Sequence, residues 1–390
     1  MPNPATSEER FDFIDSLRGI AILGVVAVHV GPSIEGLSPP LESFAAFTSR
    51  GVQLFFMLSA FTLTMISVNR PFTMCPFYIR RLFRIAPMFY LAMVGYIVLE
   101  GTEPSVFAPD GIGLKQVVLT LTFLNGWTID SFNSIVPGGW SISCEAMFYL
   151  FFPLILRYIR SARAAAIACA VSVLVALAWS MLIKTTDAYA ADEFLVGSFI
   201  RFSFLFNLLA FLSGILLYYI IAGGGRRVID RGSKGAWLLL TASIAVLIGG
   251  GVSGFSTFRN PLIAVVALLP FVYAVYLTRP IAIINPVIRH IGLVSFSVYL
   301  VHFAILDFIG GPLLAATSNL TPDLKFVVFY AAAVAISTLV ATATYRWIEL
   351  PFIGLGRRVA SARSGRLAAR AEVSASSAQV ASPPEPSGQA

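Results

Sequence analysis

Charged residues are scarce in this sequence. Asp, Glu, Lys and Arg make up 12% of its 390 residues, against about 25% in an ordinary soluble domain. Hydrophobic residues make up 57%, and the mean hydropathy is +0.82. This composition excludes a soluble globular protein and is typical of an all-α polytopic membrane protein, in which several apolar helices cross the bilayer as one bundle.

Cysteine is scarce as well. Cys75, Cys144 and Cys169 form neither a CxxC pair nor another metal-ligand spacing, so neither disulfides nor a metal site is predicted. The net charge of +7 could favour nucleic acid, but the basic residues lie between apolar segments, where membrane orientation accounts for them. No nucleic-acid partner is therefore predicted. The start, MPNPATSEER, lacks the basic region of a cleavable signal peptide, so the first apolar helix is expected to remain as a span.

Eleven stretches are apolar and about long enough to cross a membrane. The fourth is doubtful, because it is short and is followed by the turn-rich sequence TIDSFNSIVPGG. The eleven stretches are roughly 13–31, 51–68, 85–100, 114–128, 140–158, 164–183, 198–222, 235–252, 261–278, 291–310 and 325–346.

The distribution of basic residues decides the status of the fourth stretch. If it is not counted, about ten transmembrane helices remain, and 21 of the 27 Lys and Arg residues fall on one side of the membrane. Counting it as a crossing would destroy this asymmetry. By the positive-inside rule both termini are therefore expected in the cytoplasm, and residues 114–139 are expected to form a re-entrant or interfacial segment.

The same pattern suggests the domain organisation. Residues 1–10 are expected to form a cytoplasmic tail, and residues 11–358 a single transmembrane domain. After Arg358 the composition turns to Ala, Ser, Arg and Pro. Such a sequence cannot bury enough apolar surface to order itself, so residues 359–390 are expected to form a disordered cytoplasmic tail.

The first apolar stretch, DFIDSLRGIAILGVVAVHVG, carries an arginine at Arg18 and a histidine at His29. Their spacing of eleven residues places both on one face of a helix, about 17 Å apart along its axis. Polar groups inside a membrane helix usually mark function. The alternative is that Arg18 extends to the membrane surface and His29 merely ends the helix.

Two further polar residues lie inside apolar stretches. On the ten-span topology, Glu145 and His302 lie in the outer parts of their spans, at the depth of His29. A glutamate and two histidines at one depth could form a site that handles protons, since burial and mutual charge shift their pKa values. The alternative is a structural hydrogen bond between helices.

Basic residues gather on the opposite, cytoplasmic side. In the sequence YIRRLFRIAP, Arg81 and Arg84 are three residues apart and would share a helix face. With Arg80 and Arg18 they could form a cationic group that holds phosphates, for which the arginine fork is well suited. The alternative is ordinary positive-inside charge.

These motifs occur in an order that resembles one family, the integral-membrane acyltransferases of acyltransferase family 3. Arg18 and His29 resemble its first-helix signature, and FFMLSAFTL resembles its second helix, with Ala60 where a glycine is common. The resemblance covers about residues 11–360. Further segments that resemble the family are RRLFRIAPMFYL, GGWSISCEAMFYLFFP, SFSVYLVHFAI and RWIELPF.

The resemblance implies a multi-pass protein of the cell (inner or plasma) membrane. It implies transfer of an acyl group, commonly acetyl, from cytoplasmic acyl-CoA to a hydroxyl of a sugar, glycolipid or small natural product. Arg18, Arg81 and Arg84 would then hold the acyl-CoA phosphates. His29 would act as general base, supported by Glu145 or His302, or would carry the acyl group covalently. The competing hypothesis is a proton-coupled transporter or flippase, although the inverted repeats of many transporters are not evident.

Overall fold

The computed structural model describes residues 7–68, 72–223, 229–252 and 260–363. These ranges fold almost entirely into helices, and they contain an isolated bridge between Ser105 and Ala108 but no β-strand. The prediction of an all-α polytopic membrane protein is therefore confirmed.

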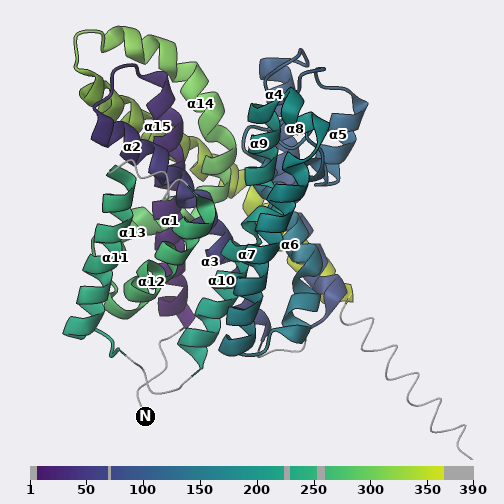
Figure 1. Cartoon of the computed structure of the whole chain (residues 1–390), viewed down its shortest axis with the longest axis vertical. Coiled ribbons are helices and arrows are strands. Elements are labelled where there is room, and N and C mark those ends of the chain that lie inside the picture. The colour runs from purple at the N-terminus through teal and green to yellow at the C-terminus, as the bar shows by residue number, and fades with distance from the viewer. Residues whose placement is uncertain (1–6, 69–71, 224–228, 253–259, 364–390) are drawn as a thin grey trace, which may run out of the picture.

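Within the described ranges, ten long helices form the bundle, which Figure 1 shows. In the described residues, nine helical stretches are long and apolar enough to cross a membrane, and α11 adds a shorter apolar stretch, Lys234–Gly249. Each long helix coincides with one of the ten predicted spans. They are α1 (Ser7–Val30), α3 (Gly51–Ser67), α4 (Met74–Glu100), α6 (Gly139–Tyr158), α7 (Ala162–Lys184), α10 (Phe204–Ala222), α11 (Lys234–Val252), α12 (Pro261–Thr278), α14 (Ser295–Ala316) and α15 (Pro322–Thr344).

The doubtful fourth stretch does not cross. It forms α5 (Leu114–Leu121) and the short turn η3 (Asn125–Trp127). Eight helical residues rise only about 12 Å, well short of the roughly 30 Å of a hydrocarbon core. Lys115 Nζ lies 2.6 Å from Asp130 Oδ2 and closes this segment. Partial burial raises the pKa of Asp130, but the hydrogen bond and charge of Lys115 outweigh that effect and leave it below its ordinary value.

Several element boundaries differ from those predicted. Helix α4 begins at Met74, eleven residues before the predicted span, so the arginine segment belongs to the same helix as that span. The last span continues as one helix to Arg363 through the π-helical segment η5 (Tyr345–Glu349). The other short elements are η1 (Gly31–Ser33), α2 (Pro39–Phe47), η2 (Thr48–Arg50), α8 (Asp187–Ala191), α9 (Glu193–Phe202) and α13 (Pro286–Leu293).

Helix α1 is the centre of the packing. It contacts α3, α13, α14 and α15, and its apolar residues Ile14, Leu17 and Ile22 are fully buried. The crossing of α1 and α13 requires glycine, because a Cβ on Gly292 would lie 1.6 Å from the carbonyl oxygen of Asp15. Helices in membranes approach closely through such small residues. The central position of α1 lets Arg18 and His29 face two different parts of the interior.

The two ends of the described chain lie at one end of the bundle. Figure 1 shows the start of α1 and the end of the C-terminal helix in the lower part of the molecule, on different sides of it. This arrangement agrees with an even number of crossings. Of the two predicted tails, residues 1–6 and 364–390 lie outside the described residues. The side of the membrane on which the ends lie stays a prediction.

Candidate active site

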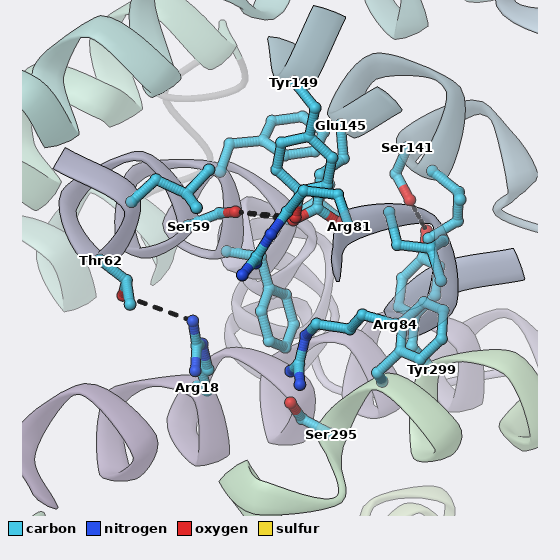
Figure 2. Close-up of a pocket in the computed structure, with 17 residues that line it drawn as sticks. Arg18, Ser59, Thr62, Arg81, Arg84, Ser141, Glu145, Tyr149, Ser295 and Tyr299 are labelled. Carbon is cyan, nitrogen blue, oxygen red and sulfur yellow. Dashed lines mark hydrogen bonds between the residues drawn. The ribbon is translucent and has the colours of Figure 1, made fainter. Parts of the chain in front are cut away.

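A narrow cavity of about 90 Å³ lies between α1, α3, α4, α6 and α14 (Figure 2). We call it the arginine cavity, because the guanidinium groups of Arg18, Arg81 and Arg84 turn toward the same space within it. Arg81 and Arg84 share one face of α4, as their spacing predicted. Arg80, which was expected to join them, is exposed and does not line the cavity.

Arg18 is held at the edge of the arginine cavity by its own helix and by α3. Its Nη1 donates to Asp15 Oδ1 at 3.2 Å, and its Nη2 donates to Thr62 Oγ1 at 3.4 Å. Among the described residues, Asp15 is the carboxylate that forms an ion pair with an arginine of this cavity. The buried Nε of Arg81 has no hydrogen-bond partner there. The cavity therefore presents several charge-bearing donors to an anion.

Glu145 lies in the arginine cavity rather than beside the histidines. Its Oε1 accepts a hydrogen bond from Ser59 Oγ at 2.6 Å and another from the Tyr149 hydroxyl. The guanidinium of Arg81 lies over the Tyr149 ring, with its carbon 5.7 Å from the ring centroid. The expected grouping of Glu145 with His29 and His302 is therefore wrong.

The reason is the opposite direction of α6 and α14. Ser141 of α6 and Tyr299 of α14 meet in a hydrogen bond of 2.8 Å. Glu145 is four residues along α6 from this point, and His302 is three residues along α14 in the other direction. At 1.5 Å per residue the two are about 10 Å apart along the helix axes. The sequence placed both in the outer parts of their spans but could not fix this offset.

The two histidines do meet, as predicted. The rings of His29 and His302 lie with centroids 5.3 Å apart, and the Phe303 ring packs against both. His302 Nδ1 lies 2.7 Å from the carbonyl oxygen of Tyr299. A carbonyl only accepts, so Nδ1 carries the proton and Nε2 carries the lone pair. That Nε2 atom is buried and has no partner among the described residues.

His29 lines a second and larger cavity of about 700 Å³, which we call the histidine cavity. Its walls include Arg50, Gln53, Trp140, Arg201 and Phe303. A volume of this size is within the range of small-molecule sites. His302, in contrast, is fully buried and lies behind His29 and Phe303.

Tyr299 separates the two cavities, because it lines both of them, as does Val52. The Tyr299 hydroxyl accepts the hydrogen bond from Ser141 and donates to the carbonyl oxygen of Gly138 at 2.9 Å. We call the group formed by Tyr299, Ser141 and Gly138 the septum. Arg18, Arg81 and Arg84 line the cavity on one side of it, and His29 lines the cavity on the other.

Comparison with known protein families identifies the family of the chain. The profile of the acyltransferase 3 family, described as an acyltransferase domain, matches residues 11–346, which include both cavities and the septum. The chain belongs to this acyltransferase family.

Two relatives of this acyltransferase illustrate the similarity. Acyltransferase MdmB of Streptomyces mycarofaciens is 29% identical over 161 residues, which cover 39% of this chain and 40% of MdmB. Peptidoglycan O-acetyltransferase OatA of Listeria monocytogenes is 24% identical over 381 residues, which cover 87% of this chain and 55% of OatA. The chain thus spans about half the length of the curated relatives it matches. No solved structure matches it.

Glu349 is a buried polar residue to which the sequence analysis gave no role. Glu349, in the motif RWIELPF, is 2% exposed and accepts a hydrogen bond from Ser297 Oγ. It belongs to the π-helical segment η5 and lies close enough to Arg84 to interact with its charge. Such π-helical turns often occur at functional sites. The sequence signal that could have identified Glu349 is a carboxylate inside an otherwise apolar helix.

Proposed function

We propose that this protein is a membrane-embedded O-acyltransferase. It moves an acyl group from cytoplasmic acyl-CoA to a hydroxyl of a cell-surface glycan, glycolipid or related acceptor, and the proposed acyl group is acetyl. The observation that carries the proposal is the pair of cavities on either side of the septum, one lined by Arg18, Arg81 and Arg84 and the other lined by His29. Family membership supplies the reaction class.

The arginine cavity is the proposed donor site. Arg18, Arg81 and Arg84 would bind phosphate oxygens of acyl-CoA, because guanidinium donors match phosphate in geometry as well as in charge. A cavity of about 90 Å³ is too small for the nucleotide. The nucleotide would therefore lie at the mouth, while the long arm carries the thioester past the arginines toward the septum.

The histidine cavity is the proposed acceptor site, with His29 as general base. As the acceptor oxygen attacks the thioester carbon, His29 takes the hydroxyl proton. A C–O bond then forms, the C–S bond breaks, and the proton ends on the thiol. Histidine suits this step because its unperturbed pKa is near neutral pH. The His302 ring, whose centroid lies 5.3 Å from that of His29, would hold the His29 ring in position by packing against it. Glu145 would support the donor site by positioning Tyr149 and Ser59.

The test is transfer from labelled acetyl-CoA in membranes that contain equal amounts of wild-type and variant protein. His29→Ala should lose about 10²–10⁴-fold in rate as a lost general base does, and a larger loss together with trapped label would favour a covalent acyl-histidine. His290→Ala is the matched control, since His290 is an exposed histidine bonded to Thr342. Near-normal transfer by His29→Ala would contradict the proposal.

The donor site has its own matched pair of variants. Arg81→Ala should weaken acyl-CoA binding by about 1.5–3 kcal/mol, the value of a charge-assisted hydrogen bond, and should raise the KM for acyl-CoA. Arg80→Ala, which removes an equal charge from the exposed face of the same helix, should leave that KM unchanged. Equal effects of the two substitutions would mean that only general surface charge matters.

A further inference from the structure

The histidine cavity contains two arginines that the acyl-transfer chemistry does not use. Arg50 belongs to η2 and Arg201 to the last turn of α9, and both line the wall of the cavity that contains His29. The charge distribution of the chain places both on the membrane side that is poor in Lys and Arg. Positive-inside charge therefore does not explain them.

Neither arginine is neutralised by a carboxylate among the described residues. Arg50 Nε and Nη2 both donate to the Ser49 hydroxyl, at 3.1 and 2.7 Å, and its buried Nη1 has no partner. Arg201 Nη2 donates to the Ser198 hydroxyl at 3.0 Å. These hydroxyls orient the guanidinium groups without cancelling their charge.

The two arginines also repel each other. Arg201 is the charged residue close enough to act on Arg50. The cavity has one acidic residue in its wall, Glu100, but its electrostatic neighbour is Asp307 and it forms no ion pair with either arginine. Two like charges in a partly desolvated cavity are costly when they are not compensated. An anion between them would remove that cost.

The rest of the histidine cavity suits a sugar ring. Trp140 and Phe202 stack with centroids 4.4 Å apart and form an aromatic wall, and the Gln53 side chain supplies an amide. Small-molecule sites combine such apolar walls with a few placed polar groups. The arrangement offers an aromatic surface for a ring, two cations for an oxyanion and one histidine for a hydroxyl.

We propose that the acceptor is an acidic glycan, whose carboxylate or phosphate is held between Arg50 and Arg201 while the hydroxyl to be acylated faces His29. The identification of this ligand as the acceptor rests on the proposed function. The anion site itself does not depend on it. The oxyanion would fix the orientation of the sugar and so select which hydroxyl reacts.

The test measures binding and transfer separately, on purified protein in detergent. Three methyl glycosides of the same ring serve as probes: glucoside, glucuronide and glucoside 6-phosphate. Thermal stabilisation of the wild type should be produced by one or both charged probes and not by the neutral one. The two charged probes distinguish a carboxylate from a phosphate.

The variants are Arg50→Gln, Arg201→Gln and the double substitution. Each single change should weaken binding of the charged probe by about 10–100-fold, as loss of a charge-assisted hydrogen bond does. Lys184→Gln is the matched control, because Lys184 is exposed and lies outside the cavity. Arg50→Lys keeps the charge and provides a folded variant if Arg50→Gln does not fold, and it should retain part of the binding.

The outcomes separate the anion site from the acyltransferase proposal. Equal affinity for charged and neutral probes, or unchanged affinity in the double variant, would overturn the anion site even if transfer proceeds. Arginine-dependent binding that survives His29→Ala would support it. Arginine-dependent binding in a protein that transfers no acyl group would keep the site and remove the proposed function. Arginine-dependent stabilisation by anionic lipid vesicles, without any by the glycosides, would assign the arginines to lipid headgroups and refute the acceptor role.

Discussion

Replacing Gly138 with alanine tests the septum directly. Gly138 has φ of +80°, a conformation that costs an L-residue about 1–2 kcal/mol. A Cβ there would lie 2.6 Å from the Tyr299 hydroxyl oxygen. Tyr299 would have to move and give up its hydrogen bonds to Ser141 and to the Gly138 carbonyl. Each of these bonds contributes about 1 kcal/mol.

The two effects together amount to a loss of about 3–4 kcal/mol in the free energy of unfolding. The apparent unfolding temperature of the purified protein should fall, and acyl transfer should fall with it, because Tyr299 lines both cavities. Gly95→Ala is the matched control. Gly95 lies within α4 with no atom near its missing Cβ, so alanine there should be neutral or stabilising by about 0.5–1 kcal/mol.

A double substitution identifies the collision as the cause. In a Tyr299→Phe background the colliding oxygen is absent, so Gly138→Ala should cost less than it does alone, because contacting residues are not additive. The reasoning would be refuted if Gly138→Ala matched Gly95→Ala in stability and transfer. It would also be refuted if the cost of Gly138→Ala were the same in both backgrounds.

Three further predictions concern the topology, the buried residue Glu349 and the partly buried residue Glu145. Reporter fusions after Ser161 and at the C-terminus should report cytoplasm, and one after Lys184 should report the opposite side; an exported signal at Ser161 would contradict the ten-span topology. Glu349→Ala should lower stability by about 1–3 kcal/mol, because it leaves the buried Ser297 hydroxyl without its partner, and thermal unfolding with Glu349→Gln as the milder comparison checks this. Glu145→Gln should change the KM for acyl-CoA and leave the pH profile of kcat unaltered, since Glu145 lines the arginine cavity. A shifted pH profile would instead indicate that Glu145 acts on a histidine.

The sequence by itself determined the class and the number of long helices. A crossing requires a run of apolar residues of fixed length, and that signal is local, so the ten long helices coincide with the predicted spans. The exclusion of residues 114–139 came from charge counting and agrees with the eight-residue helix α5. The pair Arg81 and Arg84 on one face of a helix is local in the same way, because the α-helical period fixes it.

The grouping of side chains from different helices was only partly accessible. His29 and His302 were placed at one depth and do meet, because each helix end could be located to within a turn. The same reasoning failed for Glu145, since an error of one turn on each of two antiparallel helices adds up to about 10 Å. Depth along the membrane also says nothing about which helix faces which.

The tertiary structure alone decided two features. It divided the interior into two cavities at Tyr299, because the contact of Tyr299 with Ser141 and Gly138 depends on how α6 packs against α14. It placed Arg50 and Arg201 beside His29, although they are far apart in the chain. The physical reason is common to both features: hydropathy and charge fix where a helix lies along the membrane normal, whereas its rotation and its neighbours are set by side-chain packing.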